Sequence, residues 1–114
     1  MQDGSKDKVV YIFWTCRDQE EAKKIIYALV EQKWIACASI FPEITSIYRW
    51  EGKVEEGREV KIILKTVARH FDAVQGYIKA HGSYQVPEII QLNVEQGNPD
   101  YLSWVKNETA LVQD

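Results

Sequence analysis

The first 33 residues combine a continuous apolar run with an amphipathic segment. Residues 9–15 are all β-branched or aromatic, which is typical of a strand covered on at least one face. Residues 17–33 place apolar side chains three and four positions apart, and Asp18 followed by Glu21 has the form of a helix N-cap signature. This pattern predicts a strand and then a helix that packs on the sheet. The apolar positions of the predicted helix are Ala22, Ile25, Ile26, Leu29 and Val30.

The next segment predicts a long hairpin. Residues 34–50 are rich in β-forming side chains. Pro42 lies among them and cannot donate to a sheet ladder, so it is expected at a bulge, bend or edge position. Glu51-Gly52 provides a tight turn, because glycine adopts positive φ without strain. Residues 53–66 then return as the third strand.

The second half of the chain predicts a helix, a strand and a short final helix. Residues 67–82 have helical spacing, and the helix is expected to end near Gly82. Residues 86–94 form the predicted fourth strand. Asn98 is suited to cap the third helix, with Pro99 at its first position. The apolar positions of the second helix are Val67, Phe71, Val74 and Ile78.

This order, β-α-β-β-α-β plus a terminal helix, predicts a ferredoxin-like α+β sandwich with one antiparallel sheet and two helices on one face. Strands of such a sheet need only about five or six residues each, and this hairpin is much longer. Its distal half, residues 45–59, alternates apolar positions such as Ile47 and Val54 with charge, and Gly57 is a second expected irregularity. Because proteins pair or cover long exposed edges, the hairpin is predicted to carry subunit assembly.

Composition and charge narrow the classes of function. A chain of 114 residues matches a single domain, predicted over residues 9–114 behind a polar, disordered tail at residues 1–8. No apolar run approaches the roughly 20 residues of a membrane span, and no secretory signal is visible, so we expect a cytoplasmic protein without a membrane partner. The net charge of −3 disfavours nucleic acid, whose phosphates are bound by clustered Lys and Arg.

Four motifs in the second half of the chain are specific in combination. They are Trp50-Glu51-Gly52-Lys53, Lys65-Thr66, Tyr84-x-Val86-Pro87-Glu88, and Gly97-Asn98 before Tyr101-Leu102-x-Trp104. Together they resemble the CutA family of divalent cation tolerance proteins, and the resemblance runs from Val9 to about Thr109. It implies a tight homotrimer built through the long hairpins, with lateral clefts between subunits, no obligatory cofactor and a role in the response to divalent metal ions. The interface residues that it implies are Tyr48, Trp50, Glu51, Gly52 and Trp104.

Candidate metal ligands are few. Copper and zinc bind sets of imidazole and thiolate groups, and the chain has only Cys16, Cys37, His70 and His81. Cys37 is predicted to be a small buried hydrophobe and His70 a solvated helix residue. Cys16 lacks the second thiol of a copper-chaperone loop, and His81-Gly82-Ser83-Tyr84 stands where some family members carry His-His-Pro-Tyr. The candidate ligands for copper or another divalent metal are therefore His81 and Cys16, in a weak site completed by carboxylates or a neighbouring subunit.

Enzyme chemistry is not indicated by the sequence. No nucleophile beside a base and no Gly-rich phosphate loop can be identified. Arg17 follows the first strand, where acylphosphatases of the same fold carry an anion-binding loop, but it lacks the surrounding glycines that present backbone donors. We therefore predict no catalytic residues and no enzyme activity.

Strand ends and loops supply candidates for a small-ligand cleft. The alternative is structural: Tyr84 caps the second helix, and Lys65 pairs with Glu59 or Glu88. Two functions remain. The first is a homotrimer in the response to divalent metal ions with weak copper binding, and the second is a metal-independent trimeric sensor or scaffold, by analogy with PII-like signalling proteins. The candidate cleft residues, whose counterparts the resemblance places between subunits, are Trp50, Lys65, Thr66, Tyr84 and Glu88.

Overall fold

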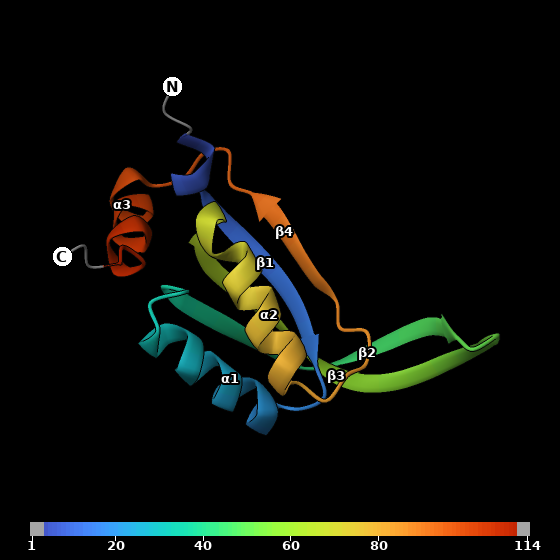
Figure 1. The fold of residues 1–114 in the computed structure, drawn as a ribbon. Coiled ribbons are helices and arrows are strands. Elements are labelled where there is room, and N and C mark those ends of the chain that lie inside the picture. Colours follow the sequence, from blue (N-terminus) through green and yellow to red (C-terminus); the bar gives the residue numbers. More distant parts are fainter. Residues whose placement is uncertain (1–3, 112–114) are drawn as a thin grey trace.

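Strands and helices follow one another in the predicted order in the computed structural model, which describes residues 4–111 (Figure 1). The described part holds four antiparallel strands and three α-helices, so the predicted ferredoxin-like α+β fold is confirmed. The elements are η1 (Gly4–Asp7), β1 (Val9–Cys16), α1 (Gln19–Glu31), β2 (Cys37–Trp50), β3 (Lys53–Val67), η2 (Ala68–His70), α2 (Phe71–His81), β4 (Ile89–Asn93) and α3 (Pro99–Glu108), where η denotes a 3-10 helix.

The four strands form one sheet in the order β2-β3-β1-β4. β1 lies between β3 and β4 and pairs antiparallel with both, so that Trp14 faces Ile62 on one side and Ile89 on the other. α1 and α2 cover one face of this sheet, and α3 packs at the end where β1 begins (Figure 1). Within residues 4–111, the opposite face of the sheet carries no helix (Figure 1).

The core lies between the sheet and the helices α1 and α2. Alternate residues of β1 point to opposite faces, and its even-numbered side chains, from Val10 to Cys16, are all buried. Leu29 of α1 and Ile78 of α2 close over them with 0% and 1% of their surface exposed. The helix ends also follow the sequence pattern, because the Asp18 carboxylate accepts from the backbone N–H of Glu21 at 2.9 Å.

The β2–β3 hairpin is the feature that departs most from an ordinary small sheet. Its strands have 14 and 15 residues, and its distal half extends beyond the helices (Figure 1). Glu51 and Gly52 form the turn with φ of 49° and 83°, and the register shifts between Phe41 and Ile44, around Pro42, as predicted. Gly57 was expected to be irregular, and this expectation is wrong, because its pairing with Ser46 continues the register without interruption.

The N-terminal segment is partly ordered against η2. Gly4–Asp7 forms a 3-10 helix, and the Asp7 carboxylate pairs with the Arg69 guanidinium, so the predicted disorder of residues 1–8 does not hold for this part. Residues 1–3 of the predicted tail and residues 112–114 of the predicted domain lie outside the described residues. Within residues 4–111, no helix combines the length and apolar character that crossing a membrane requires.

Candidate functional site

A cleft of about 470 Å³ lies beside the distal half of the hairpin. It combines three parts of the chain: the end of β1, the hairpin strands β2 and β3, and the loop between α2 and β4. Side chains two residues apart on a strand share a face, which explains why alternate β2 residues contribute. The lining residues are Thr15, Ser46, Tyr48, Trp50, Glu59, Tyr84, Gln85, Val86 and Glu88.

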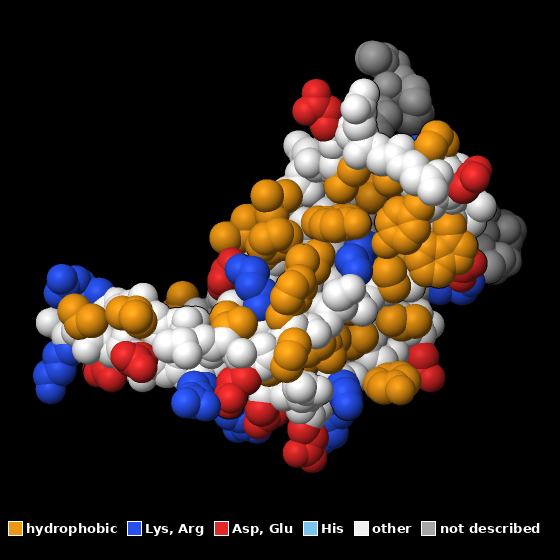
Figure 2. Space-filling view, turned by 180° about the vertical axis from the view of Figure 1, so that it is seen from behind, with side chains coloured by type: hydrophobic (Ala, Val, Ile, Leu, Met, Phe, Trp, Pro, Cys, Tyr) orange, Lys and Arg blue, Asp and Glu red, His pale blue; other side chains and the backbone are white. Residues whose placement is uncertain are grey.

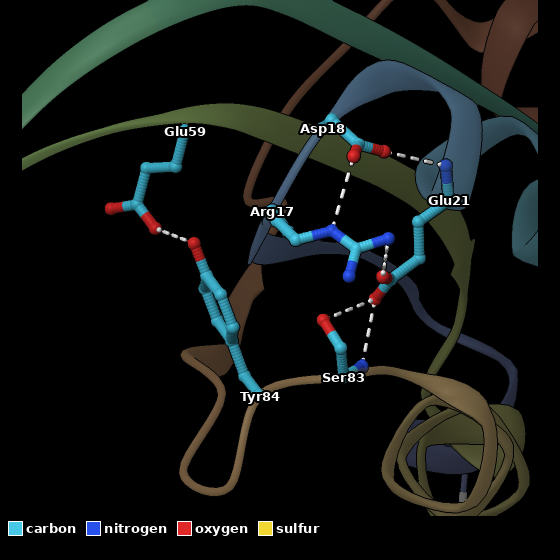
Figure 3. Close-up of polar contacts among 6 residues, drawn as sticks. All are labelled: Arg17, Asp18, Glu21, Glu59, Ser83 and Tyr84. Carbon is cyan, nitrogen blue, oxygen red and sulfur yellow. Dashed lines mark hydrogen bonds and ion pairs between the residues drawn. The ribbon is translucent and has the colours of Figure 1, made fainter.

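The carboxylate of Glu59 is the polar centre of the cleft. The Tyr84 hydroxyl donates to its Oε1 at 2.9 Å (Figure 3), and the Ser46 hydroxyl donates to its Oε2. Burial raises the pKa of the Tyr84 phenol, and the adjacent Glu59 carboxylate raises it further. Tyr84 is therefore a neutral hydrogen-bond donor at pH 7, and the proposed role of Tyr84 as a helix cap does not describe its contact.

A second polar network holds the loop that carries Tyr84. Glu21 of α1 accepts from the backbone N–H of Ser83 at 2.8 Å and from its hydroxyl at 3.3 Å. Arg17 lies 3.3 Å from the Glu21 carboxylate and 3.1 Å from that of Asp18 (Figure 3). Because Ser83 precedes Tyr84 directly, this network fixes the backbone from which the phenol reaches Glu59 (Figure 3).

The predicted cleft residues divide into two groups. Trp50, Tyr84 and Glu88 line the cleft. Lys65 does not: its ammonium donates to Ser39 at 2.6 Å on the open face of the sheet. Thr66 is wholly buried and donates to the backbone carbonyl of Trp34 at 2.6 Å, so within one chain its role is structural.

Lys65 was expected to pair with Glu59 or Glu88, but Lys61 forms the ion pair with Glu88. Lys61 lies 3.3 Å from the Glu88 carboxylate and 4.9 Å from the centre of the Phe13 ring. Glu59, expected as the other partner of Lys65, is instead held by neutral hydroxyl groups. The alternation of side chains along β3 places Glu59, Lys61 and Lys65 on one face, but six residues separate the first and the last, which is about 20 Å of strand.

The candidate metal ligands do not come together. Cys16 is 1% exposed, and burial raises the pKa of its thiol to about 12, with a further rise from Glu21. The His81 ring stacks on Tyr77 with 4.0 Å between ring centroids, beside a hollow also lined by Glu20. Among residues 4–111, no three His, Cys, Asp or Glu side chains form a group suited to hold a metal ion.

Two further sequence interpretations need correction. His70 was predicted to be solvated, but it is 4% exposed and its Nε2 lies 2.8 Å from the carbonyl oxygen of Thr109. It therefore links the start of α2 to the end of α3. Cys37 was predicted to be buried, but it is only half-buried and its sulfur lies 3.5 Å from the Tyr101 hydroxyl.

The raised pKa of Cys16 predicts that its thiol reacts slowly with disulfide reagents. We expect Ellman's reagent at pH 8 to leave Cys16 unmodified in the folded protein and to modify it after unfolding in guanidinium chloride. Because the folded pKa of about 12 exceeds the ordinary value of 9.0, the stability linked to this group is complete below pH 9 and is lost as the pH rises toward 12. A Cys16→Ala variant identifies the remaining signal as Cys37, and rapid modification of Cys16 in the folded chain would contradict the expectation.

The predicted interface residues lie on exposed parts of the chain. Tyr48 and Trp50 are 48% and 40% exposed near the hairpin tip, and Glu51 and Gly52 form the turn itself. Trp104 is 42% exposed on α3 and stacks on Tyr101. No residue of this set is committed to the core of the single chain.

These features define a class of protein: a ferredoxin-like domain with an extended hairpin, an open sheet face and a cleft beside the hairpin. A family model described as CutA1 divalent ion tolerance protein matches residues 10–108. The chain belongs to the CutA1 divalent ion tolerance family.

Individual relatives agree with this assignment. Protein CutA of Homo sapiens is 43% identical over 102 residues, which cover 90% of this chain and 57% of that protein. Divalent-cation tolerance protein CutA of Citrobacter koseri is 40% identical over 104 residues, which cover 91% and 90% of the two chains. The chain thus spans less than two thirds of the length of the human relative, and nearly all of the bacterial one.

Solved structures show the same fold. The crystal structure of CutA from Xylella fastidiosa matches with a TM-score of 0.87 and 37% identity, covering 90% of this chain and 99% of that chain. CutA from Archaeoglobus fulgidus matches with a TM-score of 0.87 and 35% identity, covering the same shares of the two chains. That archaeal protein is described as periplasmic, so the cytoplasmic location of the present chain stays a prediction.

Proposed function

We propose that this chain acts as a homotrimer in the response to divalent metal ions and is not an enzyme. The family is named for divalent ion tolerance rather than for a reaction. This name supports the role in metal response and the proposal that the chain is not an enzyme. The observation that carries the assembly is the open face of the sheet, opposite α1 and α2. Figure 2 looks at the molecule from behind and shows hydrophobic side chains gathered over this face.

The residues of this open face are too apolar for a solvated surface. Phe41, Ile90 and Leu92 are exposed by 48%, 49% and 43% in the single chain. Tyr11 and Phe13 of β1 lie between them, because they pair with Leu92 and Ile90 in the sheet register. Contiguous exposed apolar side chains of this kind mark protein interfaces in soluble domains.

The distal half of the hairpin also exposes apolar side chains, beyond the part of the sheet that the core supports. Ile47 and Val54 are each 69% exposed, on the face opposite to Tyr48 and Trp50. The hairpin therefore presents apolar side chains on both faces, and no helix of the described part of the chain covers either one (Figure 1). Packing against neighbouring subunits would cover these side chains, and it would also remove an edge open to unwanted strand pairing.

Direct metal binding is the second element of this proposal, with His81 as the anchor and carboxylates or a neighbouring subunit completing a weak site. We expect calorimetric titration of the metal-stripped protein to show weak binding of Cu(II) that is lost in His81→Ala, because imidazole is the best copper ligand exposed there. Lys79→Ala, on the same helix end, is the matched control and should leave the binding unchanged. Titration with Zn(II) and Cu(I) tests selectivity.

Cu(II) binding that is unchanged in His81→Ala would contradict the direct metal site. It would favour the second candidate function, a metal-independent trimeric sensor that holds a small ligand in the cleft. The specific observation for this candidate is that Trp50, Tyr84, Glu59 and Glu88 line one cleft, whereas the candidate metal ligands Cys16 and His81 form no such group with other side chains within residues 4–111.

A further inference from the structure

The cleft beside the hairpin has a defined chemical character, and we propose that its ligand is a small organic cation, an ammonium group on an apolar body. This inference rests on the second candidate function above and names the class of ligand. Three features carry it: an uncompensated carboxylate, aromatic rings on the same strand face, and the extended shape of the cleft.

The charge of the cleft favours a cation. Its lining includes the carboxylates of Glu59 and Glu88, and no lysine, arginine or histidine of residues 4–111 belongs to it. Lys61 neutralises Glu88 from the edge of the cleft. Glu59 accepts only from the neutral hydroxyls of Ser46 and Tyr84, and among the ion pairs within residues 4–111 none includes it.

Partial burial of Glu59 strengthens the attraction of its carboxylate for a cation. Glu59 and Tyr84 are each shielded from solvent in part, and the attraction between charges grows as water is excluded. Each oxygen of the Glu59 carboxylate receives one hydrogen bond and keeps capacity for another. An incoming ammonium group can therefore bind Glu59 without displacing either hydroxyl.

Aromatic rings extend from this carboxylate along the hairpin. Tyr48 and Trp50 follow Ser46 at intervals of two residues in β2, so the three share one face. The Tyr48 hydroxyl lies near Gly57, since a Cβ atom there would be 3.7 Å from its oxygen, an ordinary van der Waals distance.

The arrangement matches the known chemistry of cation recognition. Ring faces of Trp and Tyr attract ammonium groups, and groups of aromatic rings recognise quaternary ammonium ions. From Ser46 to Trp50 the strand rises by about 13 Å, long enough for a charged head near Glu59 and an apolar body over Trp50. A compact metal ion would use only the first part of this cleft.

Nuclear magnetic resonance titration of the full chain with choline tests the inference. We expect the shifts to cluster on the Trp50 indole N–H and on residues 84–88, and the neutral isostere 3,3-dimethyl-1-butanol to bind at least about tenfold more weakly, since it lacks the charge-assisted contact. Glu59→Gln should weaken choline binding by a similar factor. Glu56→Gln makes the same change of charge on the opposite face of β3 and should have no effect.

Each other outcome overturns the proposal in a distinct way. Equal binding of choline and its neutral isostere would make the cleft merely apolar, and preference for orthophosphate or for Zn(II) over choline would assign a different ligand class. Tyr48 and Trp50 line the cleft and also belong to the proposed subunit interface, so the titration is read together with the oligomeric state of the same sample. Sedimentation of the same sample therefore separates failure of the ligand class from failure of the assembly.

Discussion

Trp14→Ala is expected to lower the free energy of unfolding by about 3–5 kcal/mol, the largest effect of any single truncation in this chain. Trp14 is the largest fully buried side chain, with 1% of its surface exposed. It lies in β1, the strand that pairs with both β3 and β4. Its removal leaves a cavity between the sheet and the helices that a close-packed core refills only in part. The guanidinium chloride midpoint measures the loss.

Tyr27→Ala is the matched control for this prediction. Tyr27 is an aromatic residue of α1 with 72% of its surface exposed, so its truncation should change stability by no more than about 0.5 kcal/mol. Both variants must be compared at one protein concentration, because the stability of an oligomer depends on it. Equal midpoints for the two variants would show that Trp14 does not organise the core.

Trp50→Asp is expected to dissociate the proposed trimer while leaving the chain folded. Trp50 is 40% exposed in the single chain, so its replacement opens no cavity in the core. In the assembly it would place a charge in a contact that excludes water, at a cost of several kcal/mol per subunit. Sedimentation velocity should show the shift to a smaller species, and circular dichroism should show retained secondary structure.

The control uses the same chemical change away from the hairpin. Tyr27→Asp introduces the same charge on the outer surface of α1, where we expect no effect on the sedimentation coefficient. A Trp50→Asp protein that sediments like the unmodified chain would remove Trp50 from the interface. It would then leave Trp50 with a role in the cleft alone.

Much of the fold follows from local patterns in the sequence. The β-branched run of residues 9–15 became β1, and Pro42 marks the register shift because it cannot donate to the ladder. Asp18 and Asn98 cap α1 and α3 through contacts within three residues. These features depend on neighbours along the chain, so a single sequence contains the information.

The errors concern side chains whose surroundings come from distant segments. His70 has a polar side chain at a helix start, and nothing near it reveals that residue 109 lies against it. Thr66 was grouped with Lys65 because the pair ends the third strand and matches a motif of the family, although neighbours in a strand point to opposite faces. The alternation of buried Ile62 and Leu64 was the available signal that Thr66 faces the core.

The cleft, too, is formed by segments that lie far apart in the sequence. Trp50, Tyr84 and Glu88 were identified through a resemblance, but Glu59 was considered only as a partner for Lys65. Its position became clear once the hairpin register placed Ser46 and Gly57 opposite each other and the loop after α2 brought Tyr84 alongside. Contacts across 25 residues of sequence, such as that from Tyr84 to Glu59, are set by the assembled sheet.

Sedimentation equilibrium of the unmodified chain tests the proposed assembly most directly. A trimer predicts a single species of about 40 kDa, three times the 13.2 kDa of one chain, that persists on dilution to micromolar concentration. A species of 13.2 kDa would mean that the open sheet face and the extended hairpin remain exposed in solution, and would contradict the proposal that this protein works as a trimer.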